Sequence, residues 1–299
     1  MYLSNPDLRG ISDGDIEYED WQIKELAKCK RDPLHFILTY IKVVDGDKGL
    51  IPFQPREYSI EFIKNIHSNN YTLVKFPRQS GKSITVAAYL VWYIIFNKKK
   101  NAVILAHQKS MATEQLSRIK AMIQEIPLWM QQPVLKWNES SIAFANDSKI
   151  VSSATQQKSV RGFTVNFLYL DEFAFVEPHI ANGFISSVFP TISSMESAKV
   201  VVTSTPNGLN HFHKMWSEAK TLLKAKKLLE PKDWRTLEIP WDAVPGRNEA
   251  WKKNEINKIG EVRFKQEYEC ISYDEIITII DTFTGEIQKI KIGDLYGML

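Results

Sequence analysis

The sequence predicts an α/β fold with a mostly parallel central sheet flanked by helices. Two observations support this class. Short apolar segments typical of buried strands alternate along the chain with longer segments that have helical spacing. The chain also has 299 residues, of which 44% are hydrophobic and 24% charged, so it can form a globular core. This composition excludes a disordered or collagen-like chain.

The expected elements follow one another in chain order. Residues 16–45 have helical spacing that Pro33 interrupts, so two short helices are expected there. Strands are expected at 72–75, 102–106, 165–170 and 199–203, helices at 82–96, 111–125, 209–229 and 262–268, and a hairpin at 140–145 and 148–153. Apolar strands separated by helices are typical of a parallel sheet with both faces covered.

Cysteine content and charge narrow the type of protein further. Two cysteines leave little room for a disulfide framework or a structural zinc site. No run of about 18 apolar residues and no secretion signal occur, so we expect a soluble cytoplasmic protein. The last thirty residues carry a net charge of −3, which leaves +6 for residues 1–269. That excess permits a nucleic-acid partner without proving one.

The segment FPRQSGKS, residues 76–83, has the features of a phosphate-binding loop, or P-loop. It follows an apolar strand and precedes an apolar helix, an order in which backbone N–H groups surround the phosphates of a nucleotide. In such a loop Lys82 reaches the β and γ phosphates, and the Ser83 hydroxyl ligates Mg²⁺. The other loop residues expected to bind the nucleotide are Gln79, Ser80 and Gly81.

One position departs from the usual P-loop motif. The pattern GxxxxGK[ST] has its first glycine where this chain has Phe76. For this loop taken alone, a surface turn that happens to contain Gly-Lys-Ser is an equally good interpretation.

Two adjacent acids follow the apolar strand expected at 165–170. In P-loop enzymes a carboxylate at this edge of the sheet holds the Mg²⁺ shell, and the next one polarises the attacking water. Asp171 is therefore a candidate metal ligand, and Glu172 is a candidate catalytic carboxylate. The alternative is a helix N-cap and its first turn.

Polar side chains in two other segments complete the candidate site. Ser204 and Thr205 follow the strand expected at 199–203, where their hydroxyls can sense the γ-phosphate. Gln54, upstream of the P-loop, can read the edge of adenine through paired hydrogen bonds.

In this order, these residues resemble the ATPase domain of the large terminase subunit of tailed bacteriophages, most closely the myovirus type. The similarity extends over about residues 29–269. It rests on CKRDP with LHFI, FQPREY, FPRQSGKS, VILAHQKSMA, VRGF before FLYLDEFAF, and VVTSTPNGLNHFHKMW. Terminases of this kind carry an Arg-Gln-x-Gly-Lys loop, which accounts for the missing first glycine. The resemblance implies a P-loop NTPase fold and a DNA-translocating motor that uses ATP and Mg²⁺.

The resemblance also implies roles for single residues. Arg78 is implied to be a cis-acting arginine that contacts the γ-phosphate. The other implied roles are phosphate and Mg²⁺ binding by Lys82 and Ser83, metal binding by Asp171, catalysis by Glu172, and coupling of hydrolysis to movement by Ser204 and Thr205. Because the family's second glutamine position holds Ser59, adenine recognition rests on Gln54. Arg161 is either a further phosphate sensor or a loop arginine paired with a surface carboxylate.

The resemblance to large terminase subunits implies several partners, namely double-stranded DNA, the portal protein and the small terminase subunit. It also implies that the protein forms a homo-oligomeric ring on the procapsid in the host cytoplasm. Full-length terminases continue into a nuclease domain whose clustered acids bind two metal ions. Nothing after Glu269 has the length of such a domain, so we expect no nuclease activity from this chain.

The last thirty residues differ in composition from the rest. They begin with Cys270, contain eight isoleucines and three threonines, and indicate short strands around a Thr-Gly turn. This segment resembles the N-terminal fragment of a split intein, in which the Cys270 thiolate attacks the carbonyl of Glu269 to form a thioester. The resemblance implies trans-splicing with a complementary intein fragment fused to the terminase nuclease domain. The alternative for Cys270 is a small buried thiol at a strand start.

The chain is therefore expected to have three parts: an N-terminal helical segment (1–50), a P-loop ATPase domain (51–269) and a split-intein fragment (270–299). A helicase-like remodelling ATPase with a β extension is an alternative, but it needs a second motor lobe that supplies arginine fingers. A scaffold without ATPase activity would require the loss of Lys82 or of the two acids, and all three residues are present.

Overall fold

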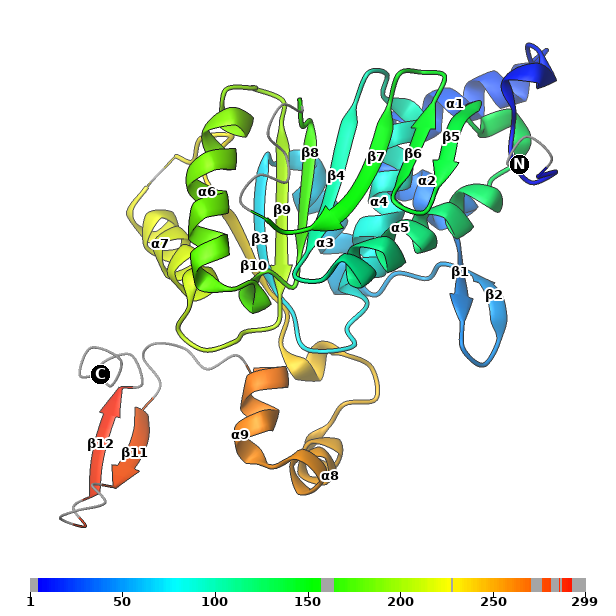
Figure 1. Ribbon diagram of the computed structural model, residues 1–299. Helices are drawn as coiled ribbons and strands as arrows, with labels where there is room; N and C mark the ends of the chain where they lie inside the picture. The colour runs from blue at the N-terminus through cyan, green and yellow to red at the C-terminus, as the bar shows by residue number, and fades with distance from the viewer. Residues whose placement is uncertain are drawn as a thin grey trace.

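An eight-stranded sheet forms the centre of the computed structural model, which describes residues 5–156, 164–226, 228–269, 276–280, 285 and 287–291 (Figure 1). In spatial order its strands are β10 (Arg235–Glu238), β3 (Tyr71–Lys75), β9 (Lys199–Ser204), β8 (Phe167–Asp171), β4 (Asn101–Ala106), β7 (Lys149–Ala154), β6 (Ser141–Phe144) and β5 (Val134–Asn138). The first six run parallel, and β6 and β5 continue antiparallel from β7. The predicted α/β class with a mostly parallel sheet is confirmed.

Helices cover both faces of this sheet. They are α1 (Asp20–Arg31), α2 (Pro33–Tyr40), α3 (Glu57–Ser68), α4 (Lys82–Phe96), α5 (Lys109–Gln124), α6 (Pro178–Ser193) and α7 (His211–Ala225). Two further helices, α8 (Glu249–Ile259) and α9 (Glu261–Phe264), lie away from these faces (Figure 1). One apolar core lies between the sheet and helices α2 to α5, and a second lies between the opposite face and helices α6 and α7. In β8, Phe167 and Tyr169 face the first core, whereas Leu168 and Leu170 face the second. This two-sided burial explains why the strand is apolar throughout.

Helix α4 carries the P-loop at its N-terminus and is almost completely buried. It packs against α2, α3 and α5, so apolar residues occur all round the helix rather than on one face. The packing holds the helix N-terminus, and with it the P-loop, in a fixed place at the edge of the sheet.

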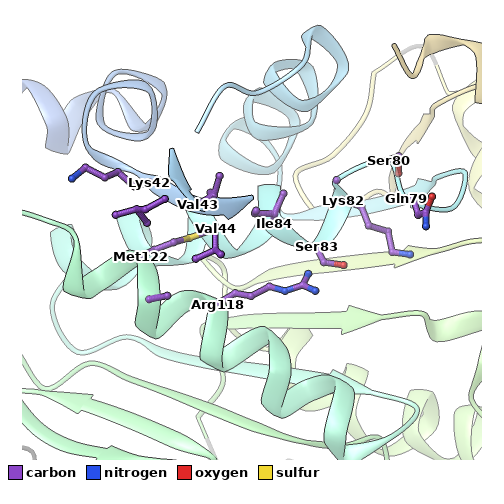
Figure 2. Close-up of a pocket in the computed structure, with 13 residues that line it drawn as sticks. Lys42, Val43, Val44, Gln79, Ser80, Lys82, Ser83, Ile84, Arg118 and Met122 are labelled. Carbon is purple, nitrogen blue, oxygen red and sulfur yellow. The ribbon is translucent and has the colours of Figure 1, made fainter. Parts of the chain in front are cut away.

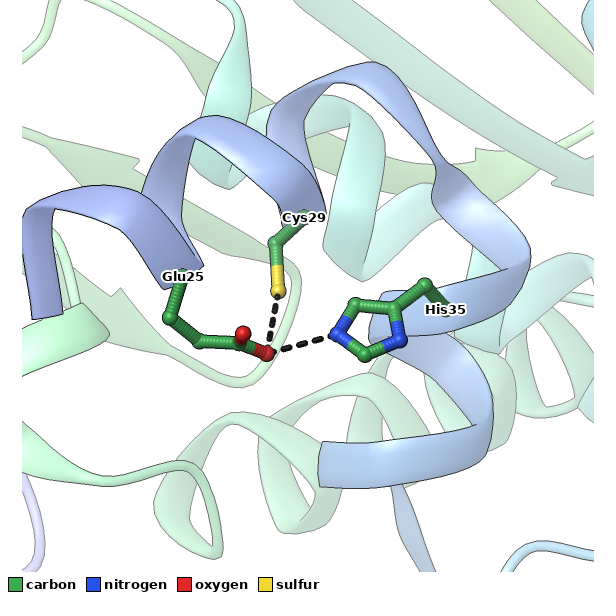
Figure 3. A group of neighbouring side chains, drawn as sticks. All are labelled: Glu25, Cys29 and His35. Carbon is green, nitrogen blue, oxygen red and sulfur yellow. Dashed lines mark hydrogen bonds and ion pairs between the residues drawn. The ribbon is translucent and has the colours of Figure 1, made fainter. Parts of the chain in front are cut away.

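A polar cluster of Glu25, Cys29 and His35 joins α1 to α2 (Figure 3). The Oε1 atom of Glu25 lies 2.6 Å from His35 Nε2 and accepts hydrogen bonds from Tyr40 OH (3.1 Å) and the Cys29 thiol (3.5 Å). Burial raises the pKa of Cys29 to about 12, so this thiol stays neutral. Because three partners already surround the Glu25 oxygen, the cluster acts as a hydrogen-bonded link between the two helices.

Residues 241–269 form a small helical unit, which we call the C-terminal module. It consists of the 3-10 helix η5 (Trp241–Ala243), α8, α9 and the π-helix η6 (Lys265–Glu269). Its aromatic rings pack with centroids 5.0–6.0 Å apart and belong to Trp241, Trp251, Phe264 and Tyr268. The Arg247 guanidinium lies over two of these rings, those of Trp251 and Tyr268.

Two hairpins form sheets of their own. One is β1 (Lys42–Asp45) with β2 (Gly49–Pro52), and the other is β11 (Ile276–Ile280) with β12 (Ile287–Lys291). The second hairpin confirms the strands expected on both sides of the Thr-Gly turn in the tail. Cys270 and residues 292–299 lie outside the described residues.

The expected elements between residues 72 and 153 are confirmed to within two residues at each end. The two N-terminal helices are also confirmed, with α2 beginning at Pro33. The expected helical range was wrong at its end, because residues 42–45 form strand β1, where Val43 and Val44 are β-branched. The α-helices and strands that the sequence did not predict are α3, α6, α8, β5, β10 and the hairpin of β1 and β2.

Within the described part of the chain, no helix is both long enough and apolar enough to cross a membrane.

Candidate nucleotide site

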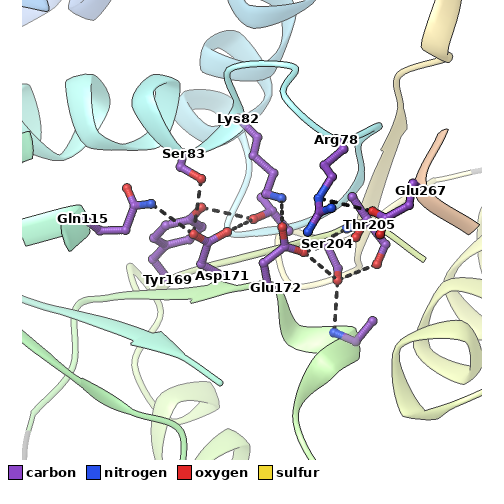
Figure 4. Close-up of polar contacts among 12 residues, drawn as sticks. Arg78, Lys82, Ser83, Gln115, Tyr169, Asp171, Glu172, Ser204, Thr205 and Glu267 are labelled. Atoms are coloured by element: carbon purple, nitrogen blue, oxygen red, sulfur yellow. Dashed lines mark hydrogen bonds and ion pairs between the residues drawn. The ribbon is translucent and has the colours of Figure 1, made fainter. Parts of the chain in front are cut away.

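The carboxyl ends of neighbouring parallel strands form the candidate site (Figure 4). β9 lies between β3 and β8, with Lys75 opposite Ser204 and Thr203 opposite Asp171. Because these strands run in the same direction, the segments that follow them meet at one edge of the sheet. The P-loop, the two acids and the Ser204-Thr205 pair therefore lie together.

The P-loop turns sharply from β3 into α4. Phe76, at the usual glycine position, is buried and packs edge-on against Phe62, with 5.2 Å between ring centroids. A side chain is accommodated at this position because it points into the core. Gln79 and Gly81 have positive φ angles of 57° and 82°, which turn the chain into the first turn of the helix. Since α4 begins at Lys82, free backbone N–H groups gather here, as in an anion-binding site.

Asp171 is the centre of a group of oxygen atoms. It is 2% exposed; Ser83 Oγ and Gln115 Nε2 each donate to its Oδ2 at 3.2 Å, and Thr203 Oγ1 donates to its Oδ1 at 3.1 Å. Burial raises the pKa of Asp171 above its ordinary value, and the Lys82 cation opposes this effect. Among the described residues, Gln115 Oε1 is buried beside the group without a hydrogen-bond partner. Carboxylate, hydroxyl and amide oxygens are the ligands that Mg²⁺ prefers.

Glu172 lies between the P-loop and the end of β9. Its Oε1 forms an ion pair with Lys82 Nζ. Its Oε2 accepts from the Thr205 N–H at 3.1 Å and from the hydroxyls of Ser204 and Thr205 at 3.4 Å. The backbone of Glu172 is left-handed, with φ 50° and ψ 45°, which non-glycine residues rarely adopt. This conformation and the donors of Ser204 and Thr205 together direct the carboxylate toward Lys82.

Arg78 is an exposed residue of the P-loop that the C-terminal module holds. Its backbone N–H donates to the Glu267 carbonyl at 3.0 Å, and its Nε lies 3.3 Å from Glu267 Oε2. Arg247 Nη2 donates to the Arg78 carbonyl at 2.7 Å. Both peptide groups of Arg78 are therefore fixed by residues that come much later in the sequence.

A cavity of about 450 Å³ opens beside the P-loop (Figure 2). One end is lined by P-loop atoms, and the other by apolar side chains of β1, β2 and α5. The lining residues are Lys42, Val43, Val44, Leu50, Gln79, Ser80, Gly81, Lys82, Ser83, Ile84, Arg118, Ala121 and Met122. A polar end next to an apolar end is the form expected of a nucleotide pocket, since phosphates and base differ in the same way.

Gln54 is exposed and is not among the residues that line this cavity. Its neighbours Arg56 and Tyr58 donate hydrogen bonds to the Ser80 carbonyl, at 3.3 and 2.7 Å. The FQPREY segment thus supports the P-loop, while adenine recognition by Gln54 stays a prediction.

Most predicted site residues come together in the structure. These are Arg78, Gln79, Ser80, Gly81, Lys82, Ser83, Asp171, Glu172, Ser204 and Thr205. Cys270 and Arg161 lie outside the described residues. Gln115, Thr203 and Glu267 contact the site but were not predicted. Helical spacing offered a signal for Gln115, because it shares the buried stripe of α5 with Leu116.

Comparison with known proteins gives one family match. Residues 73–284 match the family model described as "Terminase large subunit, T4likevirus-type, N-terminal". The match begins in β3 and extends past Glu269 into the tail.

Solved structures show the same fold. The large terminase ATPase domain of Thermus phage P74-26 has a TM-score of 0.58 at 20% identity, with coverage of 73% of this chain and 93% of that chain. The large terminase of bacteriophage HK97 has a TM-score of 0.65 at 16% identity, with coverage of 84% and 57%. The large terminase of a thermophilic bacteriophage, in complex with ADP, has a TM-score of 0.56 at 14% identity, with coverage of 75% and 55%. The chain thus spans little more than half the length of the last two proteins.

Proposed function

The chain belongs to the family of large terminase subunits of T4-like type, as their N-terminal part, and from this we propose that it is the ATPase part of a phage DNA-packaging motor. The observation that carries the proposal is the polar network at the sheet edge. In it Lys82 pairs with Glu172, and Ser83 bonds Asp171. Binding of ADP by the related terminase of a thermophilic bacteriophage supports a nucleotide in the same fold.

We propose that Lys82 exchanges its ion pair with Glu172 for contacts to the β and γ phosphates. The Glu172 carboxylate then becomes free to polarise the attacking water, while the donors at the end of β9 keep it in place. Ser83 and Asp171 would hold Mg²⁺, since their oxygen atoms already lie 3.2 Å apart. When bound, Mg²⁺ neutralises negative charge on the phosphate oxygens.

Two substitutions test these roles in the purified chain. Lys82→Ala should abolish binding of Mg-ATP, measured by calorimetry. Glu172→Gln should keep binding but lower kcat by about a hundredfold or more, because it removes the carboxylate that polarises water. Lys98→Ala and Glu177→Gln remove the same charges at positions outside the site and serve as controls. ATP turnover at the parental rate in Glu172→Gln would show that another residue activates the water.

We further propose that the motor acts on double-stranded DNA in the host cytoplasm. It would form a ring at the portal of the procapsid, with the small terminase subunit as a partner. The family match and the net charge of +6 on residues 1–269 support this assignment. We also propose the division into segments 1–50, 51–269 and 270–299.

For the tail we propose the N-terminal fragment of a split intein, with Cys270 as the nucleophile. The first-position cysteine, the isoleucine-rich composition and a hairpin that forms a sheet of its own support this proposal. A continuation of the terminase chain is the competing interpretation, and it is favoured by the family match up to residue 284. In our proposal a separate polypeptide supplies the complementary fragment and the nuclease domain.

A further inference from the structure

The cavity beside the P-loop contains a basic side chain that none of the assigned roles uses. Three basic residues line this cavity: Lys42, Lys82 and Arg118. Lys82 belongs to the P-loop, and Lys42 forms an ion pair with Glu125 at 3.3 Å. In Figure 2 Lys42 lies at the far end, whereas Arg118 extends from α5 along the cavity toward Ser83.

The direction of Arg118 follows from the position of its helix. α5 follows β4, which runs parallel to β3, so this helix begins at the same edge of the sheet as the P-loop. Side chains on a helix lean toward its N-terminus. The guanidinium of Arg118 therefore leans toward the edge where the phosphates of a nucleotide would lie.

The position of Arg118 along α5 indicates which phosphate it can reach. Gln115, one turn earlier, donates to Asp171 and so lies on the side where the proposed Mg²⁺ and γ-phosphate would bind. Arg118 lies about 4.5 Å further along the helix axis, toward the apolar end that Met122 helps to line. The β and α phosphates lie between the γ-phosphate and the nucleoside. Because the β and γ phosphates are assigned to Lys82, the phosphate left for Arg118 is the α-phosphate, which is bonded to the nucleoside.

The present partner of Arg118 is easily exchanged. Its Nη2 atom lies 2.5 Å from Glu114 Oε1 on the same helix, and the two side chains are 41% and 62% exposed. An exposed pair of this kind contributes little to stability. A guanidinium also has five N–H donors in a planar fork, a geometry that matches two phosphate oxygens.

We propose that Arg118 binds the α-phosphate of the nucleotide in this cavity. The inference rests on the proposed ATPase function and adds a residue to its binding site. Lys82 would hold the β and γ phosphates, and Arg118 would fix the nucleoside half against the apolar wall. Since ADP and ATP both carry an α-phosphate, Arg118 should contribute equally to the binding of both.

Calorimetric titration with Mg-ATP and Mg-ADP tests this assignment, with Glu172→Gln as the parent so that ATP is not consumed. Arg118→Ala should weaken binding of both nucleotides by the same factor, about tenfold or more, as expected for a lost charged hydrogen bond. Arg118→Lys should be intermediate, because it keeps the charge but not the fork. Glu114→Gln should bind no more weakly than the parent.

Lys120→Ala is the matched control, because it removes a cation from the same helix outside the cavity. It should bind both nucleotides within about twofold of the parent. Unchanged affinity in Arg118→Ala would overturn the inference, and so would a loss confined to ATP, which would assign Arg118 to the γ-phosphate. A parent that bound neither nucleotide would instead contradict the proposed function itself.

Discussion

Arg78 of the P-loop and Glu267 of the π-helix η6 are joined through both backbone and side chain. The Arg78 N–H donates to the Glu267 carbonyl at 3.0 Å, and Nε lies 3.3 Å from the Glu267 carboxylate. The Arg78 side chain is 63% exposed, so its ion pair is open to competition from other anions. A γ-phosphate that pairs with Arg78 would have to displace the Glu267 carboxylate. Because Glu267 belongs to the C-terminal module, this exchange would couple nucleotide binding to that module.

Removing the charge of Glu267 should therefore tighten nucleotide binding. Glu267→Gln keeps the backbone hydrogen bond but releases the Arg78 guanidinium for the phosphate. An exposed ion pair contributes about 0.2–1 kcal/mol, so we expect the affinity for Mg-ATP to rise by a factor of about 1.4 to 5. Calorimetric titration of the two proteins measures this change.

A double-mutant cycle separates this effect from a general change in charge. In an Arg78→Ala background Glu267→Gln should have no effect, because its partner is gone. Glu261→Gln, an exposed acid of the same module, is the matched control. An equal gain in the presence and absence of Arg78 would mean that Glu267 does not act through this arginine.

Asp171→Asn should raise stability and abolish activity. Because burial raises the pKa of Asp171, the native state binds this proton more tightly than the unfolded chain does, and the group's contribution to stability falls as pH rises. At neutral pH the free energy of unfolding of the nucleotide-free variant should therefore exceed that of the parent by about 1 kcal/mol, or about 2–4 °C in Tm. In acid this difference should be smaller. Thermal unfolding at several pH values tests this, with exposed Asp47→Asn as the control. Loss of stability in Asp171→Asn would refute the expected cost of the buried charge.

Glu25→Gln should weaken the link between α1 and α2 in a pH-dependent way. The hydrogen bond to His35 holds the pKa of Glu25 below its ordinary value of 4.5. Such a group stabilises the fold above its unfolded pKa, and this stabilisation is lost as pH falls through the lowered value. At neutral pH we expect a loss of about 1 kcal/mol in the free energy of unfolding, measured with urea. The difference in the free energy of unfolding between Glu25→Gln and the parent should become smaller in acid. The exposed control Glu17→Gln should have the same free energy of unfolding as the parent at every pH. A constant difference at every pH would exclude an ionic contribution.

Those parts of the site that consist of contiguous residues could be predicted from the sequence. The P-loop lies between an apolar strand and an apolar helix, so its local pattern already predicts Lys82 at the start of α4. Asp171 is the last residue of a strand that is buried on both faces, and Glu172 follows it, so the two acids contrast with the apolar residues before them. In each case one short segment carries both the structure and the chemistry.

Residues that reach the site from distant segments could not be predicted in this way. Glu267 meets Arg78 only because the C-terminal module packs beside the P-loop, and Gln115 meets Asp171 only because α5 lies next to β4. Helix α6 was not predicted; it contains Pro190, which is unfavourable inside a helix, yet Phe184 and Val188 bury its apolar stripe against the sheet. Tertiary packing determines both the contacts between these distant residues and the formation of α6, and a local sequence pattern carries no information on such packing.

Cleavage of the bond between Glu269 and Cys270 distinguishes the two interpretations of the tail. If residues 270–299 are an intein fragment, the complementary fragment should close the fold around this bond and favour exchange of the amide for a thioester. With the candidate partner present, an added thiol should then release residues 1–269, and without thiol the ligated product should lack residues 270–299. Because the tail carries a net charge of −3, a basic partner fragment should associate more slowly as salt rises. Mass spectrometry of both reactions identifies these products directly.

Cys270→Ala should block cleavage and ligation but not association, whereas Cys29→Ala, which removes the other thiol, should leave both reactions intact. Products that retain the tail, or ligation that survives Cys270→Ala, would instead favour a tail that continues the terminase chain.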